Sequence, residues 1–226
     1  MNVKKTITAL IIVVAAAAPA ALAANFADTR GHWAESIIDN LAAKGIVSGV
    51  SDTEFNPDGT VTRAEFYRMA MGAVNIEESK YREGECLDVK STAWYANTVQ
   101  TALDRGLVPA DMVDNYSVKV ETGEGGAKAV YSGTFNAETP ITREEMAYVT
   151  MSVYQYSLGE DGLDKLEMPI DLGFADVAAI SPWAMDGVKH AYANNLIYGM
   201  DDGTFAPKST ATRAQAASII TNLLNK

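Results

Sequence analysis

One pattern occurs three times in this chain of 226 residues and constrains its fold more than any other feature. Each copy has an Asp, a Trp that opens an expected helix, a turn, and a Phe followed by a Thr-Arg pair that opens a second helix. The spacing agrees between copies: 12 residues separate Trp33 from Gly45, Trp94 from Gly106 and Trp183 from Asn195, and 8 residues separate Phe55 from Arg63, Phe135 from Arg143 and Phe205 from Arg213. This register predicts three repeated units that bury their apolar faces against one another.

Apolar spacing predicts that each unit is a helix, a loop and a second helix. Trp33, Ile37, Ile38 and Leu41 form one apolar stripe, and a second stripe follows the first Thr-Arg pair at Phe66, Met69, Ala70, Ala73 and Val74. One unit cannot bury both stripes alone. We therefore expect a mainly α fold in which three units pack around a shared axis.

Two stretches interrupt the period. The first and third copies span 30 residues from Trp to Arg, whereas Trp94 to Arg143 spans 49, so the middle copy holds 19 extra residues. Alternating Val118 and Val120, a Gly-rich turn and an apolar return predict a small β-hairpin at about 116–133. Residues 158–173 are acidic and contain Gly and Pro, which is typical of a linker.

The first 23 residues are expected to be a signal peptide. Lys4 and Lys5 precede an apolar run that ends before Pro19, and Ala21-Leu22-Ala23 is a small-residue cleavage site. Removing the two lysines changes the formal charge from −11 to −13. This acidity argues against a nucleic-acid partner, and we expect an exported chain without a transmembrane segment after cleavage.

The Thr-Arg pairs contain two different signals. Thr62, Thr142 and Thr212 are each followed three residues later by Glu65, Glu145 and Gln215, which is the capping-box pattern of a helix start. Capping does not explain the Arg that follows each Thr, because a cation in the first turn opposes the helix dipole. An anionic ligand explains it, because the Arg fork and free N–H groups at the helix start would bind the same anion.

At these residues the chain resembles the S-layer homology (SLH) family of bacterial surface proteins. VTRAE from Val61 is closest to the family pattern, and ATRAQ from Ala211 is a near variant. The middle copy departs from it, with Glu144 after its Thr-Arg pair and Ala110 where Gly49 and Gly199 stand in the outer copies. The resemblance implies a pseudo-threefold bundle of SLH repeats at 24–86, 87–157 and 174–226, with grooves between neighbouring repeats.

The resemblance also implies which residues bind. In the family the repeated Arg reads an acidic, often pyruvate-ketal-bearing, wall polysaccharide. The candidate ligand-binding residues are Arg63, Arg143, Arg213, Trp33, Trp94, Trp183, Asp28, Asp88, Asp176, Gly49 and Gly199. Two alternatives stay open: the arginines pair with the nearby Asp residues, and the Trp rings belong to the core.

If the arginines bind ligand, replacing Arg63 or Arg213 by Ala is expected to leave stability within about 0.5 kcal/mol. Arg143 is expected to matter least, because its repeat departs from the pattern and carries the insertion.

Other function classes fit less well. The loop from Glu54 to Glu65 approximates a calcium-binding loop, but the aligned loops of the other copies lack its ligands. His32 and His190 have no nucleophile or metal-ligand partners at suitable spacing, so we expect no enzyme, no cofactor and no metal. We expect non-covalent anchoring to a secondary cell-wall polysaccharide at the bacterial surface. The alternatives are direct peptidoglycan binding that links envelope layers, and a subunit that self-assembles into a surface layer. Other surface-layer proteins are possible partners.

Overall fold

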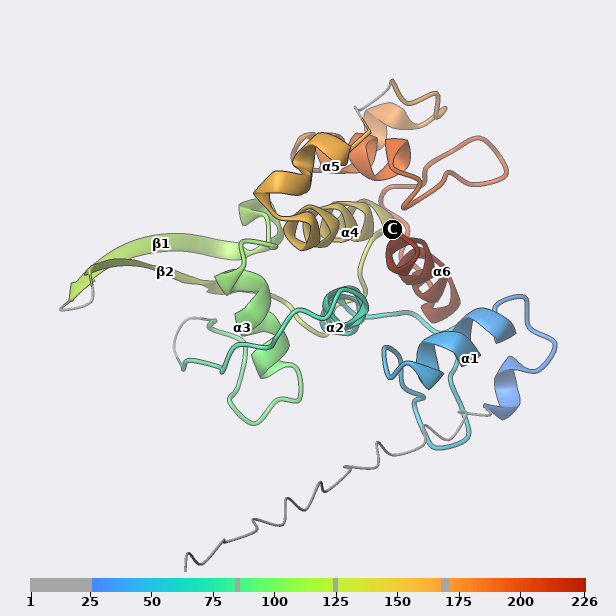
Figure 1. Cartoon of the computed structure of the whole chain (residues 1–226), viewed down its shortest axis with the longest axis horizontal. Helices are drawn as coiled ribbons and strands as arrows, with labels where there is room; N and C mark the ends of the chain where they lie inside the picture. Colours follow the sequence, from blue (N-terminus) through green and yellow to red (C-terminus); the bar gives the residue numbers. More distant parts are fainter. Residues whose placement is uncertain (1–25, 84–85, 124–125, 168–170) are drawn as a thin grey trace, which may run out of the picture.

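The computed structural model describes residues 26–83, 86–123, 126–167 and 171–226 and is built mainly from helices (Figure 1). The first helices of the three repeats are α1 Glu35–Ala43, α3 Ala96–Asp104 and α5 Pro182–Ala193, and the second helices are α2 Arg63–Ala73, α4 Arg143–Leu158 and α6 Arg213–Leu224. Short 3₁₀ helices lie at Ala27–Thr29, Ala110–Met112, Glu160–Lys165 and Val177–Ala179. The two strands are β1 Asp114–Gly123 and β2 Gly126–Thr134.

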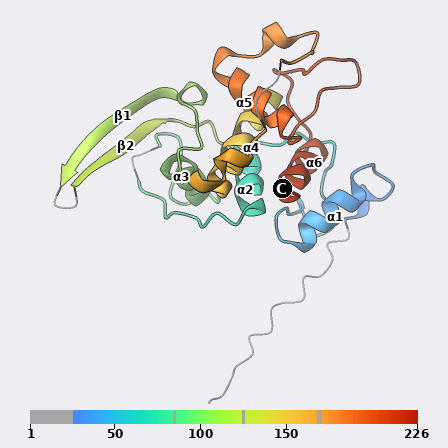
Figure 2. The same ribbon diagram turned by 45° about the horizontal axis from the view of Figure 1, so that its top comes forward.

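The three second helices form the centre of the molecule. Helices α2, α4 and α6 contact one another pairwise, and each first helix packs on the second helix of the preceding repeat: α3 on α2, α5 on α4 and α1 on α6. Figures 1 and 2 show this arrangement of three outer helices around three inner ones. The predicted mainly α, pseudo-threefold bundle is therefore confirmed.

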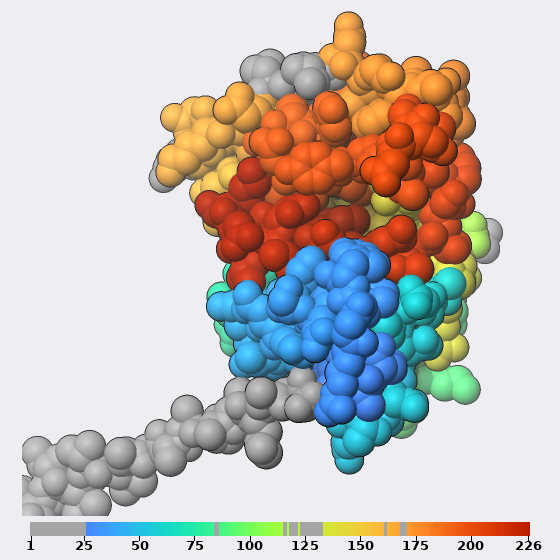
Figure 3. Space-filling model, turned by 90° about the vertical axis from the view of Figure 1, so that its right-hand side faces the viewer, coloured from blue at the N-terminus to red at the C-terminus, as the bar shows by residue number. Residues whose placement is uncertain are grey.

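A ring of backbone hydrogen bonds closes the bundle around its axis. Val61 N–H donates to the carbonyl of Ala211, Ala211 N–H to Ile141, and Ile141 N–H to Val61, at 3.2, 3.4 and 3.0 Å. All three side chains are fully buried. Because the ring joins the residues just before the three Thr-Arg pairs, it fixes the starts of α2, α4 and α6 relative to one another. In Figure 3 the repeat nearest the N-terminus accordingly lies against the C-terminal part of the chain.

The predicted capping boxes are present at all three second helices. The hydroxyls of Thr62, Thr142 and Thr212 accept from the backbone N–H groups of Glu65, Glu145 and Gln215, and these side chains in turn accept from the Thr N–H groups. Each box satisfies two otherwise unpaired donors at the helix start. Gly45, Gly106 and Asn195 take the left-handed conformation just after the first helices, which explains their fixed distance from each Trp.

The expected apolar stripes are confirmed except at Trp33, the first residue of the first stripe. Ile38 and Leu41 of α1 are fully buried, and so are Phe66 and Ala70 of α2. Trp33 and Trp94 instead precede their helices and are 60% and 54% exposed, so the alternative that these two rings belong to the core is wrong. Only Trp183 lies within its helix, where it is partly buried against the core.

The insertion in the middle repeat is the predicted β-hairpin. Strands β1 and β2 pair antiparallel, with Ser117 opposite Ser132 and Gly123 opposite Gly126. Figure 1 shows this ribbon extending away from the helical bundle. The hairpin is thus an addition to the repeat and leaves the positions of α3 and α4 in the bundle intact.

Two predicted segments join or precede the repeats. The expected linker contains the 3₁₀ helix Glu160–Lys165, and it docks on the third repeat where the side chain of Asn194 bonds the backbone N–H and carbonyl of Glu167. The expected signal peptide at 1–23 lies outside the described residues. Within the described part of the chain, no helix combines the length and apolar character needed to cross a membrane.

Candidate binding grooves

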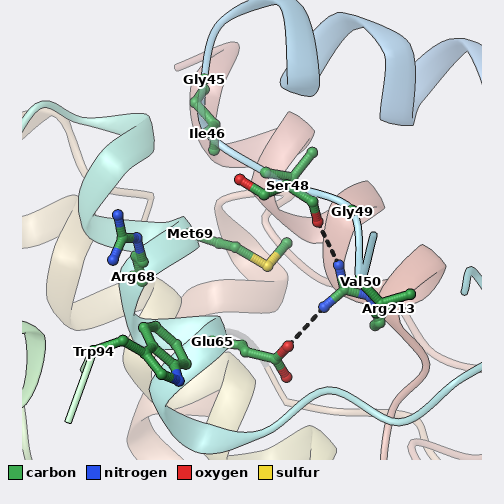
Figure 4. A pocket seen from close by; sticks show the side chains of 11 residues that line it. Gly45, Ile46, Ser48, Gly49, Val50, Glu65, Arg68, Met69, Trp94 and Arg213 are labelled. Carbon is green, nitrogen blue, oxygen red and sulfur yellow. Dashed lines mark hydrogen bonds and ion pairs between the residues drawn. The ribbon is translucent and has the colours of Figure 1, made fainter. Parts of the chain in front are cut away.

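A groove of about 340 Å³ lies where all three repeats meet, and we call it the Arg213 groove (Figure 4). Its wall is the loop after α1, at Ser48, Gly49 and Val50, and one turn of α2 that presents Glu65, Arg68 and Met69. Trp94 from the second repeat and Arg213 from the third complete it. The exposed guanidinium of Arg68 lies over the Trp94 ring, 5.7 Å from its centroid.

Arg213 is fully engaged within this groove. Its Nε and Nη2 donate to the carbonyls of Phe55 and Ser48, at 2.8 and 2.7 Å, and its Nη1 pairs with Glu65 Oε1 at 2.7 Å. The guanidinium also lies over the Phe55 ring at 4.5 Å. Burial lowers the pKa of Arg213, whereas Glu65 and Asp28 oppose that shift. Arg213 therefore ties the third repeat to the loop of the first.

A second groove, of about 140 Å³, repeats this arrangement one step around the axis, and we call it the Arg143 groove. Its wall is the loop at Ile197, Tyr198 and Gly199, together with Gln215 and Ser218 of α6. Trp33 of the first repeat and Arg143 of the second occupy the places that Trp94 and Arg213 hold in the other groove. The pseudo-threefold axis thus relates two grooves, each built from three repeats.

Arg143 has fewer partners than Arg213. Its Nε and Nη2 donate to the carbonyls of Phe205 and Tyr198, both at 2.8 Å, and the guanidinium lies 5.2 Å from the Phe205 ring centroid. Gln215 stands where Glu65 stands in the Arg213 groove. Burial lowers the pKa of Arg143, and the charge of Asp176 partly offsets this.

At the third equivalent position, around Arg63, two aromatic side chains pack against each other. Arg63 Nη1 donates to the carbonyls of Met112 and Phe135, and its Nη2 pairs with Glu145 at 2.5 Å. Tyr148, five residues after Arg143, corresponds to Arg68 and Ser218 of the two grooves. Its ring packs edge-on against Trp183 at 5.7 Å, which explains why Trp183 is less exposed than Trp33 and Trp94.

The helix starts do not offer free N–H groups to a ligand, as the sequence had suggested. The N–H groups of Arg63, Arg143 and Arg213 donate to the carbonyls of Thr139, Ser209 and Gly59 in the next repeat around the axis. The following residues donate in the same way, to Ala137, Pro207 and Pro57. Anion binding by these helix ends is therefore excluded, because neighbouring loops already cap them.

The three candidate Asp residues lie beside the grooves and hold the loops. The carboxylates of Asp28, Asp88 and Asp176 accept from consecutive backbone N–H groups at Phe55 and Asn56, Phe135 and Asn136, and Phe205 and Ala206. Burial raises the pKa of Asp28, but the backbone hydrogen bonds and the charge of Arg213 together outweigh it and leave the pKa below its usual value. Among the described residues, the carboxylate partners of Arg63 and Arg213 are Glu145 and Glu65, so the alternative that these two arginines pair with the nearby Asp residues is wrong.

Close ring packing accounts for the glycines in the two loops. A Cβ at Gly49 would lie 2.4 Å from the Phe26 ring, and one at Gly199 would lie 2.3 Å from the Phe174 ring. Cys86 takes the corresponding place in the middle repeat, where it is buried. Ala110, at the place of Gly49 and Gly199, begins the 3₁₀ helix Ala110–Met112.

Sequence reasoning missed two groups that the structure places near these sites. Glu144, the departure in the middle Thr-Arg motif, accepts from the backbone N–H and hydroxyl of Ser181, both at 2.9 Å, and pairs with Lys208 at 2.5 Å. It therefore links the start of α4 to Ser181, the residue just before α5. Arg68 entered no prediction either, although its alignment with Tyr148 and Ser218 could have marked the position as variable between grooves.

Comparison with known proteins agrees with this architecture. Residues 25–66 and 173–217 match the family profile described as the S-layer homology domain. The chain carries S-layer homology domains. The two matched segments are the first and third repeats. The middle repeat, which bears the hairpin, Ala110 and Glu144, lies outside the matched segments.

Relatives share this SLH-bearing segment in proteins of different kinds. The chain is 36% identical to exoglucanase XynX of Acetivibrio thermocellus and to an amylopullulanase of Thermoanaerobacterium thermosulfurigenes, over 89% of this chain but only 16% and 10% of those proteins. It is 24% identical to the surface-layer 125 kDa protein of Lysinibacillus sphaericus, over 94% of this chain and 16% of that protein. The chain thus spans between a tenth and a sixth of these relatives. Because enzymes and surface-layer proteins share it, the common segment is a binding module and not an enzyme.

Proposed function

We propose that this chain attaches its protein to the cell wall by binding an anionic wall polysaccharide non-covalently in the grooves between SLH repeats. The repeats would correspond to 24–86, 87–157 and 174–226, joined by the linker 158–173. Export behind the signal peptide at 1–23 would bring them to the bacterial surface. The relatives support this, because one is itself named a surface-layer protein.

The observation that carries the proposal is the recurrence of one groove design. In both grooves a buried Arg lies at the floor and an exposed Trp from another repeat stands at the rim. An exposed indole packs well on the apolar face of a sugar ring, and a cationic floor favours an acidic substituent. Within this proposal Trp33 and Trp94 contact ligand, whereas the Asp and Gly residues shape the loops and Trp183 packs on Tyr148 at the third position.

Sedimentation with purified wall sacculi tests the proposal. The mature chain from Ala24 should pellet with native sacculi at neutral pH and be released by denaturant, because binding depends on folded grooves. Sacculi whose polysaccharide has been removed by acid serve as the matched control, and binding to them should be lost. Equal binding to stripped sacculi would instead indicate peptidoglycan as the ligand. Pelleting without sacculi would indicate self-assembly into a surface layer.

A further inference from the structure

A cavity of about 560 Å³ lies at the surface of the middle repeat, outside the two grooves, and we call it the Trp94 cup. The residues that line it belong to this one repeat and include Asp88, Lys90, Thr92, Trp94, Tyr95 and Glu138. Trp94 also lines the Arg213 groove, so a single indole borders both cavities. The described residues that line the cup include no arginine, so its chemistry differs from that of the grooves.

The loop residue three positions after the repeated Phe has a side-chain partner in both outer repeats. In the first repeat this residue is Asp58, whose Oδ1 lies 3.3 Å from Nε2 of His32, the residue just before the Trp of that repeat. In the third repeat it is Lys208, whose Nζ contacts Ser181 Oγ and lies 2.5 Å from Glu144 Oε1. Neighbouring side chains therefore already bind the charged groups of Asp58 and Lys208.

In the middle repeat the corresponding loop residue is Glu138, which is not paired in this way. The residue at the place of His32 is Ala93, whose side chain has no polar atom. Glu138 is exposed, and no described cation forms an ion pair with it. Its carboxylate lies beside the Tyr95 hydroxyl: burial raises the pKa of Tyr95, and the charges of Glu138 and Asp88 add to this effect. Glu138 therefore keeps lone pairs that can accept from the hydroxyls of a ligand.

Two further polar side chains of the cup are also available to a ligand. Lys90 and Thr92 are exposed, and neither side chain forms a hydrogen bond or ion pair with another described residue. The Asp88 carboxylate differs, because it accepts from the backbone N–H groups of Phe135 and Asn136. The cup thus offers one ammonium, one hydroxyl and the carboxylate of the loop residue. Since two carboxylates outnumber one ammonium, the cup does not favour an acidic sugar.

We propose that the Trp94 cup is a second saccharide site, which binds an uncharged hexopyranose residue outside the grooves. The indole of Trp94, which is 54% exposed, packs on the apolar face of the sugar ring. Glu138 accepts hydrogen bonds from the sugar hydroxyls, and Lys90 and Thr92 donate to the sugar oxygens. The inference goes beyond anchoring through the grooves and does not depend on it, because the cup lies within one repeat.

Nuclear magnetic resonance tests the cup directly, because the three tryptophans give three indole N–H signals. The probes are methyl β-D-glucopyranoside and its 2-acetamido analogue, both uncharged, and Trp94→Phe identifies the signal of Trp94. At least one probe should shift that signal in a saturable way. The Trp183 signal should stay in place, because this ring packs against Tyr148 and does not line the cup. The probe that binds more tightly shows whether the cup takes a hexose or an N-acetylated amino sugar.

Glu138→Lys is the decisive variant, because it introduces the residue of the third repeat at an exposed position and should fold like the wild type. Losing the charge-assisted bonds should weaken the better probe by at least about tenfold. Arg68→Ala, which alters the Arg213 groove and not the lining of the cup, is the matched control and should leave the affinity nearly unchanged. The inference is overturned if neither probe shifts the Trp94 signal, if Glu138→Lys binds as tightly as the wild type, or if Arg68→Ala weakens binding more than Glu138→Lys does.

Attachment to the wall is measured separately, so the two proposals can fail independently. A wild type that does not sediment with native sacculi contradicts anchoring but not the cup, because the cup is tested with purified protein and a monosaccharide. A wild type that sediments normally but shows no shift of the Trp94 signal contradicts the cup and leaves anchoring intact.

Discussion

At the scale of single residues, Ala206 carries backbone strain that its counterparts avoid. Asn56, Asn136 and Ala206 hold the same place in the three loops, and all have positive φ, at 59°, 57° and 53°. Asn tolerates this left-handed conformation, whereas the same conformation destabilises Ala by about 1 kcal/mol. This conformation directs the Ala206 N–H toward the Asp176 carboxylate, to which it donates a hydrogen bond.

Ala206→Asn should therefore stabilise the protein by about 0.5–1 kcal/mol, because Asn adopts positive φ more readily. Thermal unfolding should shift upward by about 2 °C or more for a domain of this size. Asn56→Ala, which introduces the same strain in the first loop, is the matched control and should lower the midpoint. A lower midpoint for Ala206→Asn would contradict this account of the loop.

The one cysteine, Cys86, is a packing residue with an unreactive thiol. Burial raises its pKa to about 12, and the hydrogen bond to Asp88 and the charge of that carboxylate add to the effect. Because the thiolate is the reactive form, iodoacetamide at pH 8 should modify native protein far more slowly than protein in urea. Mass spectrometry over time measures both rates, and equal rates would show that the site opens readily.

At the scale of elements, the contacts that the repeated arginines make between repeats change how much stability we expect a mutation to remove. The sequence correctly predicted the helices and capping boxes from the Thr-x-x-Glu spacing, which is local. It could not show that Arg213 reaches the carbonyls of Ser48 and Phe55, since those contacts join residues more than 150 positions apart. The expectation that Arg213→Ala leaves stability unchanged rested on an exposed side chain, which the structure does not have.

We now expect Arg213→Ala to lower the free energy of unfolding by about 3 kcal/mol, because it leaves Glu65 and the carbonyls of Phe55 and Ser48 without their donor. Arg68→Ala is the matched control from the same groove. Arg68 is exposed, so its loss should change stability by about 0.5 kcal/mol or less. Urea denaturation compares the free energies of unfolding of the two variants. A similar small effect for both would show that the contacts of Arg213 between repeats contribute little to stability.

At the scale of the whole molecule, the repeat count and the hairpin could be predicted, because both follow from periods in the sequence. The difference between grooves could not, because it depends on which side chains the pseudo-threefold axis brings together. Tyr148 meets Trp183 because α5 packs on α4, and Gln215 shares a groove with Arg143 because α6 contacts α4. A single Gln in a capping box looks conservative in sequence and changes the charge of a groove in the fold.

The hairpin should be dispensable for folding. Ser117 and Ser132 are paired, so an Asn-Gly turn can join them in place of residues 118–131. The deletion retains Gly133, whose carbonyl accepts from Leu87, and Phe135, whose carbonyl accepts from Arg63. Circular dichroism should show the same helical signal and a melting midpoint within about 3 °C of the wild type. A much larger drop would indicate that the ribbon packs on the core.

The closed ring predicts that two repeats do not form a stable domain. Truncation after residue 173 removes α5 and α6, which takes from Arg143 its acceptors at Tyr198 and Phe205 and from Glu65 its partner Arg213. It also opens the backbone ring at Ala211 and exposes the buried faces of α2 and α4.

Fragment 24–173 should therefore lack a cooperative thermal transition, whereas mixing it with fragment 174–226 should restore helical signal and a transition, since the interface between them is that of the intact bundle. The matched control is the full chain nicked by a protease between 158 and 173, where the linker can be cut without removing a repeat. If fragment 24–173 alone melts cooperatively as a monomer near the wild-type midpoint, ring closure is not what holds the repeats together.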